Sequence, residues 1–303
     1  MDSIETSIKN IRGELKNYLI GNKIQSLVIG VSGGIDSCLC VALAKPICEE
    51  LDIPLIGRSL PITTNAPDEL ERAQLTGKAF CTDFKEANLA NYFNALSDIN
   101  FIKEHSSELV KLTPEELDDV EKGCRIRAGN IKARLRMIYL YNLASIHKGM
   151  VLSTDNYTEL LLGFWTLHGD VGDYGMIQNL WKSEVYAMAE WIRDNECTWL
   201  EEETALDLTI NALATDGLGV TNRGDLGQIL PEWEGSSRDG YQEVDRILQV
   251  WEDRFRLGEK QQKIIEAEYS KNPVIQRHKG TAFKRTNPVN IPRAVILYGP
   301  SVR

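Results

Sequence analysis

A short polar run interrupts two apolar stretches near the start of the chain. Residues 28–37 read VIGVSGGIDS, with two adjacent glycines, two serines and one aspartate. Glycines let a backbone approach an anion closely, and serine hydroxyls can donate hydrogen bonds to it. A carboxylate in an anion site implies a bridging cation, and Mg²⁺ on phosphate oxygens is the natural candidate. The run predicts a phosphate site, although an ordinary strand-to-helix turn could use the same glycines for geometry alone.

The pattern around this run predicts the elements that would position it. Apolar residues 25–31 indicate a buried strand, and residues 35–51 a helix that Pro46 should kink or shorten. Further helices are expected over residues 1–20, 66–81, 86–104, up to about 147, 182–195 and 241–270, with strands over 54–62 and 149–154. Residues 207–240 and the proline-rich tail are expected to be irregular.

Strands that alternate with helices at this spacing predict an α/β fold. The expected architecture is a doubly wound, mostly parallel sheet with helices on both faces, formed by residues 1–303 as a single domain. Ligands of such folds bind at the carboxyl ends of the strands, where the loop at 32–37 would lie.

Composition narrows the class of partner. The 303 residues carry a net charge of −10, so neither nucleic acid nor an anionic membrane is an expected partner. This charge does not exclude a local basic pocket that binds a phosphorylated small molecule. No segment has the length and apolarity of a membrane span or a secretory signal. The six cysteines include no C-x-x-C pair, which predicts reduced thiols in a cytoplasmic protein, and the four scattered histidines argue against zinc.

Several segments together resemble one enzyme family. S-G-G-x-D-S is typical of ATP pyrophosphatases, which split ATP into AMP and pyrophosphate and share an adenine nucleotide alpha hydrolase-like fold. The other segments are similar to those of NAD synthetases, and in the same order: GNIKARLRMIYLYNLA (129–144), LSTDNYTELLLGFWTLHGD (152–170), LWKSEVYAMAEW (180–191), EETALDL (202–208) and RHK (277–279).

This resemblance implies roles for particular residues. The ATP contacts would be Ser32, Gly33, Gly34, Asp36, Ser37, Thr154, Lys182 and Thr204. Asp36 and Glu159 would hold Mg²⁺. Deamido-NAD would contact Arg134, Asp173, His278 and Lys279. Asp170, near the entering ammonia, and Lys182, beside the phosphates, would be the catalytic residues.

The implied reaction is ATP-dependent amidation of deamido-NAD to NAD with ammonia. It would pass through an adenylated intermediate and release AMP and pyrophosphate, in a homodimer. Alternatives are amidation of nicotinic acid mononucleotide and a nucleotide-binding regulatory protein without catalysis. Asn156 and Leu167 depart from the ammonia-using type and look more like glutamine-using members. The chain nevertheless leaves no room for a glutaminase domain, and a separate glutaminase partner is unproven.

Each of these residues also has a plain structural interpretation. Glu159 could be a solvated acid at a helix start, Lys182 a surface lysine and Arg134 a solvated charge. Asp170 and Asp173 could simply form a loop. The match at residues 278–279 could be chance in an irregular tail.

Overall fold

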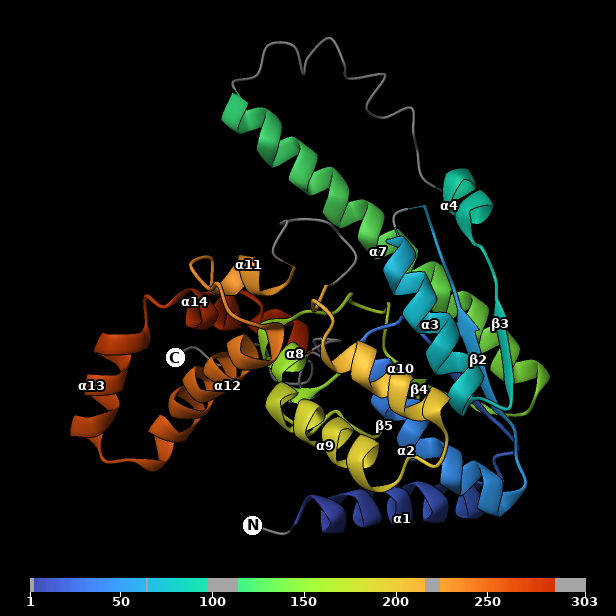
Figure 1. Cartoon of the computed structure of the whole chain (residues 1–303). Coiled ribbons are helices and arrows are strands. Elements are labelled where there is room, and N and C mark those ends of the chain that lie inside the picture. The colour runs from blue at the N-terminus through green and yellow to red at the C-terminus, as the bar shows by residue number, and fades with distance from the viewer. Residues whose placement is uncertain (1–2, 64, 97–113, 216–223, 287–303) are drawn as a thin grey trace, which may run out of the picture.

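Five parallel strands form the centre of the structure. The computed structural model describes residues 3–63, 65–96, 114–215 and 224–286 (Figure 1). The strands are β1 (Leu27–Gly30), β2 (Leu55–Ser59), β3 (Asp83–Glu86), β4 (Met150–Ser153) and β5 (Tyr174–Gly175). Their order is β3-β2-β1-β4-β5, so the chain builds outward from β1 in one direction and then in the other. The switch between β1 and β4 is the point where doubly wound folds bind ligands.

Helices cover both faces of this sheet, which confirms the predicted fold class. One layer contains α1 (Ile4–Asn22), α2 (Ile35–Leu51), α3 (Pro67–Phe80), α9 (Lys182–Asn195) and α10 (Leu200–Ile210). The other face is covered by α7 (Pro114–Ile146), beside which lies α4 (Ala90–Leu96). The remaining elements, α8 (Tyr157–Leu162), α11 (Leu226–Ile229), α12 (Ser237–Asp253), η1 (Arg254–Arg256), α13 (Glu259–Tyr269), α14 (Pro273–Gly280) and η2 (Ala282–Thr286), include those drawn in orange and red in Figure 1.

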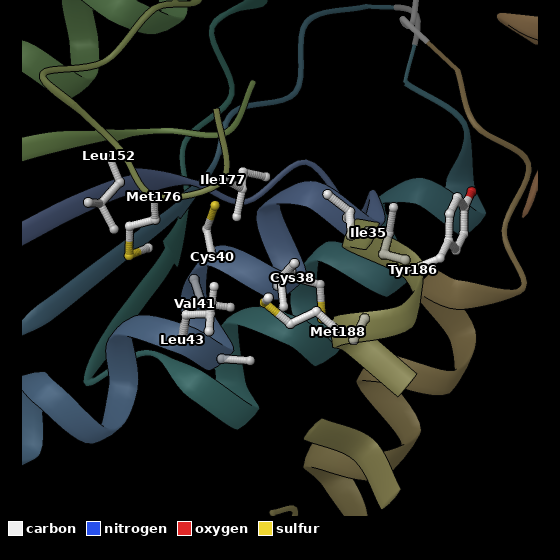
Figure 2. Close-up of a cluster of buried hydrophobic side chains, with 14 of the residues drawn as sticks. Ile35, Cys38, Cys40, Val41, Leu43, Leu152, Met176, Ile177, Tyr186 and Met188 are labelled. Atoms are coloured by element: carbon white, nitrogen blue, oxygen red, sulfur yellow. The ribbon is translucent and has the colours of Figure 1, made fainter. Parts of the chain in front are cut away.

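Alternating strand side chains supply two apolar cores. Leu27 and Ile29 of β1 join the larger cluster, while Val28 points into the smaller one under α7. Figure 2 shows part of the larger cluster, in which sulfur-containing side chains such as Cys38 and Met188 pack among aliphatic ones. All six cysteines are free, and burial raises the pKa of Cys38 to about 11.

Helix α2 continues through Pro46 to Leu51, so the expected shortening is wrong. Proline has no N–H to donate to the carbonyl of Ala42, four residues earlier. Arg12 of α1 supplies donors for these carbonyls, because its guanidinium donates to those of Ala42 and Leu43 at 3.3 Å. Both carboxylate oxygens of Glu196 hold the guanidinium of Arg12 in place.

Several other element predictions need correction. Residues 83–86 form an edge strand, and the helix expected over 86–104 is α4, which ends at Leu96; residues 97–113 lie outside the described part. Charged residues hid β3, because an edge strand faces solvent and tolerates them. Residues 207–240 include the end of α10, all of α11 and the start of α12, while 216–223 are not described. Asn272 caps α14 and Pro273 occupies its first turn, both of which are ordinary helix-start signals.

Candidate functional site

A cavity of about 270 Å³ opens at the carboxyl ends of β1, β2 and β4. Eight of the sequence-predicted site residues line it: Ser32, Gly33, Gly34, Asp36, Thr154, Glu159, Asp170 and Lys182. Three arginines that sequence reasoning did not single out also line it: Arg58, Arg72 and Arg136. With Lys182, these arginines give the cavity four cationic side chains that suit a polyphosphate, beside carboxylates that suit a bridging cation.

The two glycines after β1 have different reasons for being glycine. Gly33 has φ +85°, and a Cβ there would lie 2.2 Å from the backbone oxygen of Glu69. Gly34 has ordinary extended backbone, with φ −92° and ψ 161°, and is the N-cap of α2. Among the described residues no side chain caps α2, so its first amides can serve a bound anion.

The two serines hold this loop in shape. The Ser37 hydroxyl donates to the Gly34 carbonyl at 3.0 Å and accepts from the Ser32 amide at 3.3 Å. Ser37 is buried and does not line the cavity, whereas Ser32 does. A direct phosphate contact by Ser37 stays a prediction, and its position supports a role in positioning the loop.

Lys182 joins two carboxylates at the floor of the cavity. Its side chain is 3% exposed, which makes the surface-lysine interpretation wrong. The Nζ atom contacts the Asp36 carboxylate and lies 3.1 Å from Oε1 of Glu159. Burial alone would lower the pKa of Lys182, but these two carboxylates raise it well above its ordinary value. The lysine is therefore a cation at neutral pH, although a positive charge in the first turn of α9 is disfavoured by the helix dipole.

Asn156 connects both carboxylates to β4. Its amide nitrogen donates to Oδ1 of Asp36 at 2.9 Å, and its amide oxygen accepts from the backbone of Glu159 at 3.0 Å. Glu159 in turn accepts from the Asn156 amide, completing a capping box for α8. Glu159 does start a helix, but it is not solvated, and burial raises its pKa to about 8.

Asp245 of α12 supports this cluster from behind and was missed by sequence reasoning. It is 1% exposed and accepts from the Thr158 hydroxyl at 2.5 Å and the Ser183 backbone at 2.7 Å. The Thr158 hydroxyl also accepts from the Lys182 backbone at 2.9 Å. A signal was present in the sequence, because Asp245 interrupts a helical apolar face that includes Tyr241, Val244 and Leu248.

Asp170 and Asp173 lie in one loop but face different surroundings. Asp170 lines the cavity and accepts from the Thr166 amide at 2.7 Å, so it shapes the loop as well. Burial raises its pKa, while the positive charges of Lys284 and Arg136 act in the opposite direction. Asp173 is exposed, accepts from the Val151 amide at 2.9 Å and lies 3.1 Å from the Tyr141 hydroxyl.

Besides Ser37, five predicted residues do not line the cavity: Thr204, Arg134, Asp173, His278 and Lys279. Thr204 lies within α10, and Thr209 of the same helix lines the cavity instead. Arg134 is exposed on α7 and donates to the Leu167 carbonyl at 2.9 Å.

His278 and Lys279 belong to α14, so their expected place in an irregular tail is wrong. His278 is buried, with Nδ1 3.1 Å from the Leu161 carbonyl and Nε2 3.5 Å from Glu252. Burial lowers its pKa. Lys279 places its ammonium 4.5 Å from the centre of the Trp251 ring. In the described chain these contacts join α14 to α8 and α12.

The residues fit the expected magnesium ion. Within the described ranges no group of three or more His, Cys, Asp or Glu side chains could hold a metal alone. Asp36 and Glu159 nevertheless converge on one point, now taken by the Lys182 ammonium. Mg²⁺ typically binds one or two carboxylates together with substrate phosphates and water, so this pair is a suitable donor set.

Comparisons with known proteins agree with this geometry. Residues 7–221 match the family model described as NAD synthase. An NH₃-dependent NAD⁺ synthetase of Methanococcoides burtonii is 30% identical over 76% of this chain and 73% of its own length. Among solved structures, the NMN synthetase of Francisella tularensis aligns with TM-score 0.65 and 22% identity, covering 97% of this chain and all of that one. The NH₃-dependent NAD synthetase of Campylobacter jejuni aligns with TM-score 0.61 and 22% identity, covering 96% and 100%. At these identities the structural matches establish the fold. None of the described helices is both long and apolar enough to cross a bilayer.

Proposed function

The chain belongs to the NAD synthase family, and from this premise we propose that it amidates deamido-NAD to NAD, using ATP and ammonia. The products from ATP would be AMP and pyrophosphate, released through an adenylated intermediate. One observation carries the proposal: Asp36, Glu159 and Lys182 meet beside the glycine loop in a single cavity lined by arginines. A regulatory protein without catalysis would have no need to bury such a cluster.

The ATP half of the reaction follows from this arrangement. The amides of α2 and the arginines would hold the phosphate chain, and Lys182 would offset the charge that develops when the substrate carboxylate attacks the α-phosphorus. Asp36 and Glu159 would hold Mg²⁺, which when bound neutralises phosphate charge and orients the leaving pyrophosphate. Thr154 lines the same cavity and would complete the contacts.

The amidation half is assigned to Asp170. Ammonia must reach the activated carboxyl carbon and lose a proton as the C–N bond forms and AMP leaves. Asp170 faces the cavity, and its raised pKa makes it a better proton acceptor than an ordinary aspartate. Burial also raises the pKa of Cys38, Cys48 and Cys81, the reverse of what an activated thiolate needs. We therefore expect the chain to use ammonium and to be inactive with glutamine alone.

Binding of deamido-NAD would need a second copy of the chain. Arg134 shares one side of α7 with exposed Ile138 and Tyr141, and Tyr141 lies 3.4 Å from the carbonyl of exposed Val171. This apolar surface supports a homodimer that packs along α7 and encloses Arg134 and Asp173 with the deamido-NAD. Ile138→Glu should then give a monomer in sedimentation and weaken binding of the acid substrate. A dimer that survives this change would place the interface elsewhere.

Product identification tests the proposal directly. The purified chain is incubated with ATP, Mg²⁺, ammonium and deamido-NAD, and the products are identified by mass spectrometry. NAD, AMP and pyrophosphate in equal amounts are expected, and ADP with phosphate would contradict the family chemistry. A parallel reaction with nicotinic acid mononucleotide separates the two acid substrates. Absence of AMP release with either acid would favour the regulatory alternative.

The remaining proposals concern the setting of the enzyme. We propose that residues 1–303 act as one catalytic domain. The free cysteines suit a reducing compartment and support a cytoplasmic location.

A further inference from the structure

A second cavity of about 220 Å³ lies next to the end of β4. Six residues line it: Asp155, Leu160, Trp165, His168, Val171 and Gln178. Side chains alternate along the extended segment that ends β4, so Leu152 and Thr154 face the first cavity while Asp155 faces the second. The loop of residues 163–173 contributes to both cavities, because Asp170 lines the first and three of its other residues line the second.

Asp155 is an unusually placed carboxylate. It is 9% exposed, and within the described chain its side chain receives one hydrogen bond, from the Ser153 hydroxyl to Oδ2 at 2.9 Å, and makes no ion pair. Burial raises the pKa of Asp155 to about 7, and the negative charges of Asp170 and Asp36 add to this effect. A buried carboxylate with so few partners is costly unless it serves a cation or a proton.

Trp165, which lines the same cavity, carries a second unsatisfied group. The indole N–H of Trp165 is buried and has no hydrogen-bond partner among the described residues. An indole N–H is a donor only, so it requires a ligand with a free electron pair. The cavity thus offers a carboxylate to a cation and a donor to a lone pair. Ammonium is a cation that the carboxylate can bind, and the ammonia formed when it loses a proton has a lone pair that can accept from the indole N–H.

The charges of the two cavities also differ. Both signs of charge line the first cavity: the cations are Arg58, Arg72, Arg136 and Lys182, and the carboxylates are Asp36, Glu69, Glu159, Asp170 and Asp225. No lysine or arginine is among the described residues that line the second. Lys284 lies nearby, with its ammonium 5.6 Å from the centre of the Trp165 ring, but it donates to the carbonyls of Gly163 and Trp165.

We propose that the second cavity admits ammonium and that Asp155 binds it and accepts its proton, releasing neutral ammonia toward Asp170. The inference deepens the proposed function and rests on it. One N–H bond of ammonium breaks, an O–H bond forms on Asp155, and the electron pair remains on nitrogen. That pair then forms the C–N bond as AMP leaves, and Asp170 accepts the second proton that nitrogen loses. Asp155 returns its own proton to water through the second cavity.

Asp155→Asn tests the proton-accepting role with little change in shape. At neutral pH, kcat/KM for ammonium should fall about 100-fold, while pyrophosphate exchange and the KM values for ATP and deamido-NAD stay unchanged. Raising the pH toward the pKa of ammonium should restore much of the activity, because neutral ammonia needs no base. Asp52→Asn, a change at an exposed helix end, is the matched control and should alter none of these values. A normal kcat/KM for ammonium, or a loss without rescue at high pH, would overturn the assignment.

Rubidium, which resembles ammonium in size and charge, tests the site without turnover. Crystals soaked in rubidium chloride should show an anomalous peak at the Asp155 carboxylate that is absent from Asp155→Asn. No peak there in the wild-type protein would overturn the cation site, even if the chain makes NAD. A peak in a protein that makes no NAD would instead refute the proposed function and leave the cation site standing.

Discussion

The cavity at the carboxyl ends of the strands gathers its expected residues into one site, whereas the residues expected to bind deamido-NAD lie on separate surfaces. In the cavity, side chains from the β1 loop, α2, α8 and α9 converge within hydrogen-bonding distance, although Asp36 and Lys182 are separated by 146 positions in the sequence. The four expected dinucleotide residues are spread over α7, the following loop and α14. Arg134 and Asp173 face outward, while His278 and Lys279 contact neighbouring helices.

This difference indicates which half of the reaction one chain supports alone. Strand ends and helix starts bring the phosphate-binding groups together as soon as the sheet forms. Within the described chain, no such arrangement of strand ends and helix starts brings the exposed residues on α7 together with the other expected deamido-NAD residues. We infer that ATP binding is a property of the single chain, and that dinucleotide binding depends on the partner copy proposed above.

Removing the central lysine should have the largest effect. Lys182→Met leaves Asp36 and Glu159, whose side chains are each 17% exposed, side by side without their cation. We expect unfolding to become easier by about 3 kcal/mol, the lower end of the cost of breaking a buried ion pair. Burial already raises the pKa of Glu159 to about 8, so the folded chain holds a proton there that the unfolded chain releases. The stability contributed by that proton is lost as the pH rises toward 8, and the loss should be steeper in the variant. Urea unfolding near pH 6 and near pH 8 measures this.

The matched control is a lysine in an exposed ion pair. Lys9 contacts Glu5 on the surface of α1, so Lys9→Met should cost under about 1 kcal/mol and show no added pH dependence. Equal destabilisation by Lys182→Met at both pH values would mean that the two carboxylates are not the cause.

Asp36→Asn should separate folding from chemistry in the cavity. An asparagine oxygen can still accept from Asn156 and Glu159 still contacts Lys182, so the chain should stay folded, with a thermal midpoint lowered by the loss of one ion pair. AMP release should fall about 1000-fold, because the site loses one of the two charges offered to Mg²⁺ and a group that orients Lys182. AMP formation measured against Mg²⁺ concentration gives the result, and full activity would remove Asp36 from the site.

Asp170→Asn tests the boundary between the two halves. Amide formation should slow about 100-fold because the proton acceptor is lost. Adenylate formation, reported by pyrophosphate exchange, should remain within a few-fold of the wild-type rate, since the phosphate groups are untouched. A variant with normal amidation would show that another group accepts the proton.

Arg134→Ala should weaken only the binding of deamido-NAD. A charged hydrogen bond to the substrate is worth about 1.5–3 kcal/mol, so the KM for deamido-NAD should rise at least about 10-fold while that for ATP is unchanged. Kinetics with each substrate varied in turn measure both values. If both rise together, the two regions are not independent and the contrast between them fails.

The same contrast explains which features the sequence predicts. Helices α2 and α9 have the predicted bounds, because each carries a sustained apolar pattern. Asp36, Glu159 and Lys182 could be proposed together only through the resemblance, since their spacing contains no hint that one ammonium contacts both carboxylates. The bond from Asn156 to Asp36 spans 120 positions, and that from Thr158 to Asp245 spans 87. Such pairings depend on the order of strands and helices in space, which local patterns do not specify.

The smallest expected effect concerns two threonines of α10. The resemblance assigns the ATP contact to Thr204, but Thr209 is the one that lines the cavity, with its hydroxyl 3.0 Å from the carbonyls of Ala205 and Leu206. Replacement by valine keeps the shape of either side chain and removes only the hydroxyl. We expect Thr209→Val to raise the KM for ATP about 3-fold, as the loss of one neutral hydrogen bond predicts, and Thr204→Val to leave it unchanged. The opposite result would mean that α10 turns or shifts when ATP binds, and that the cavity in the single chain is not yet arranged for its nucleotide.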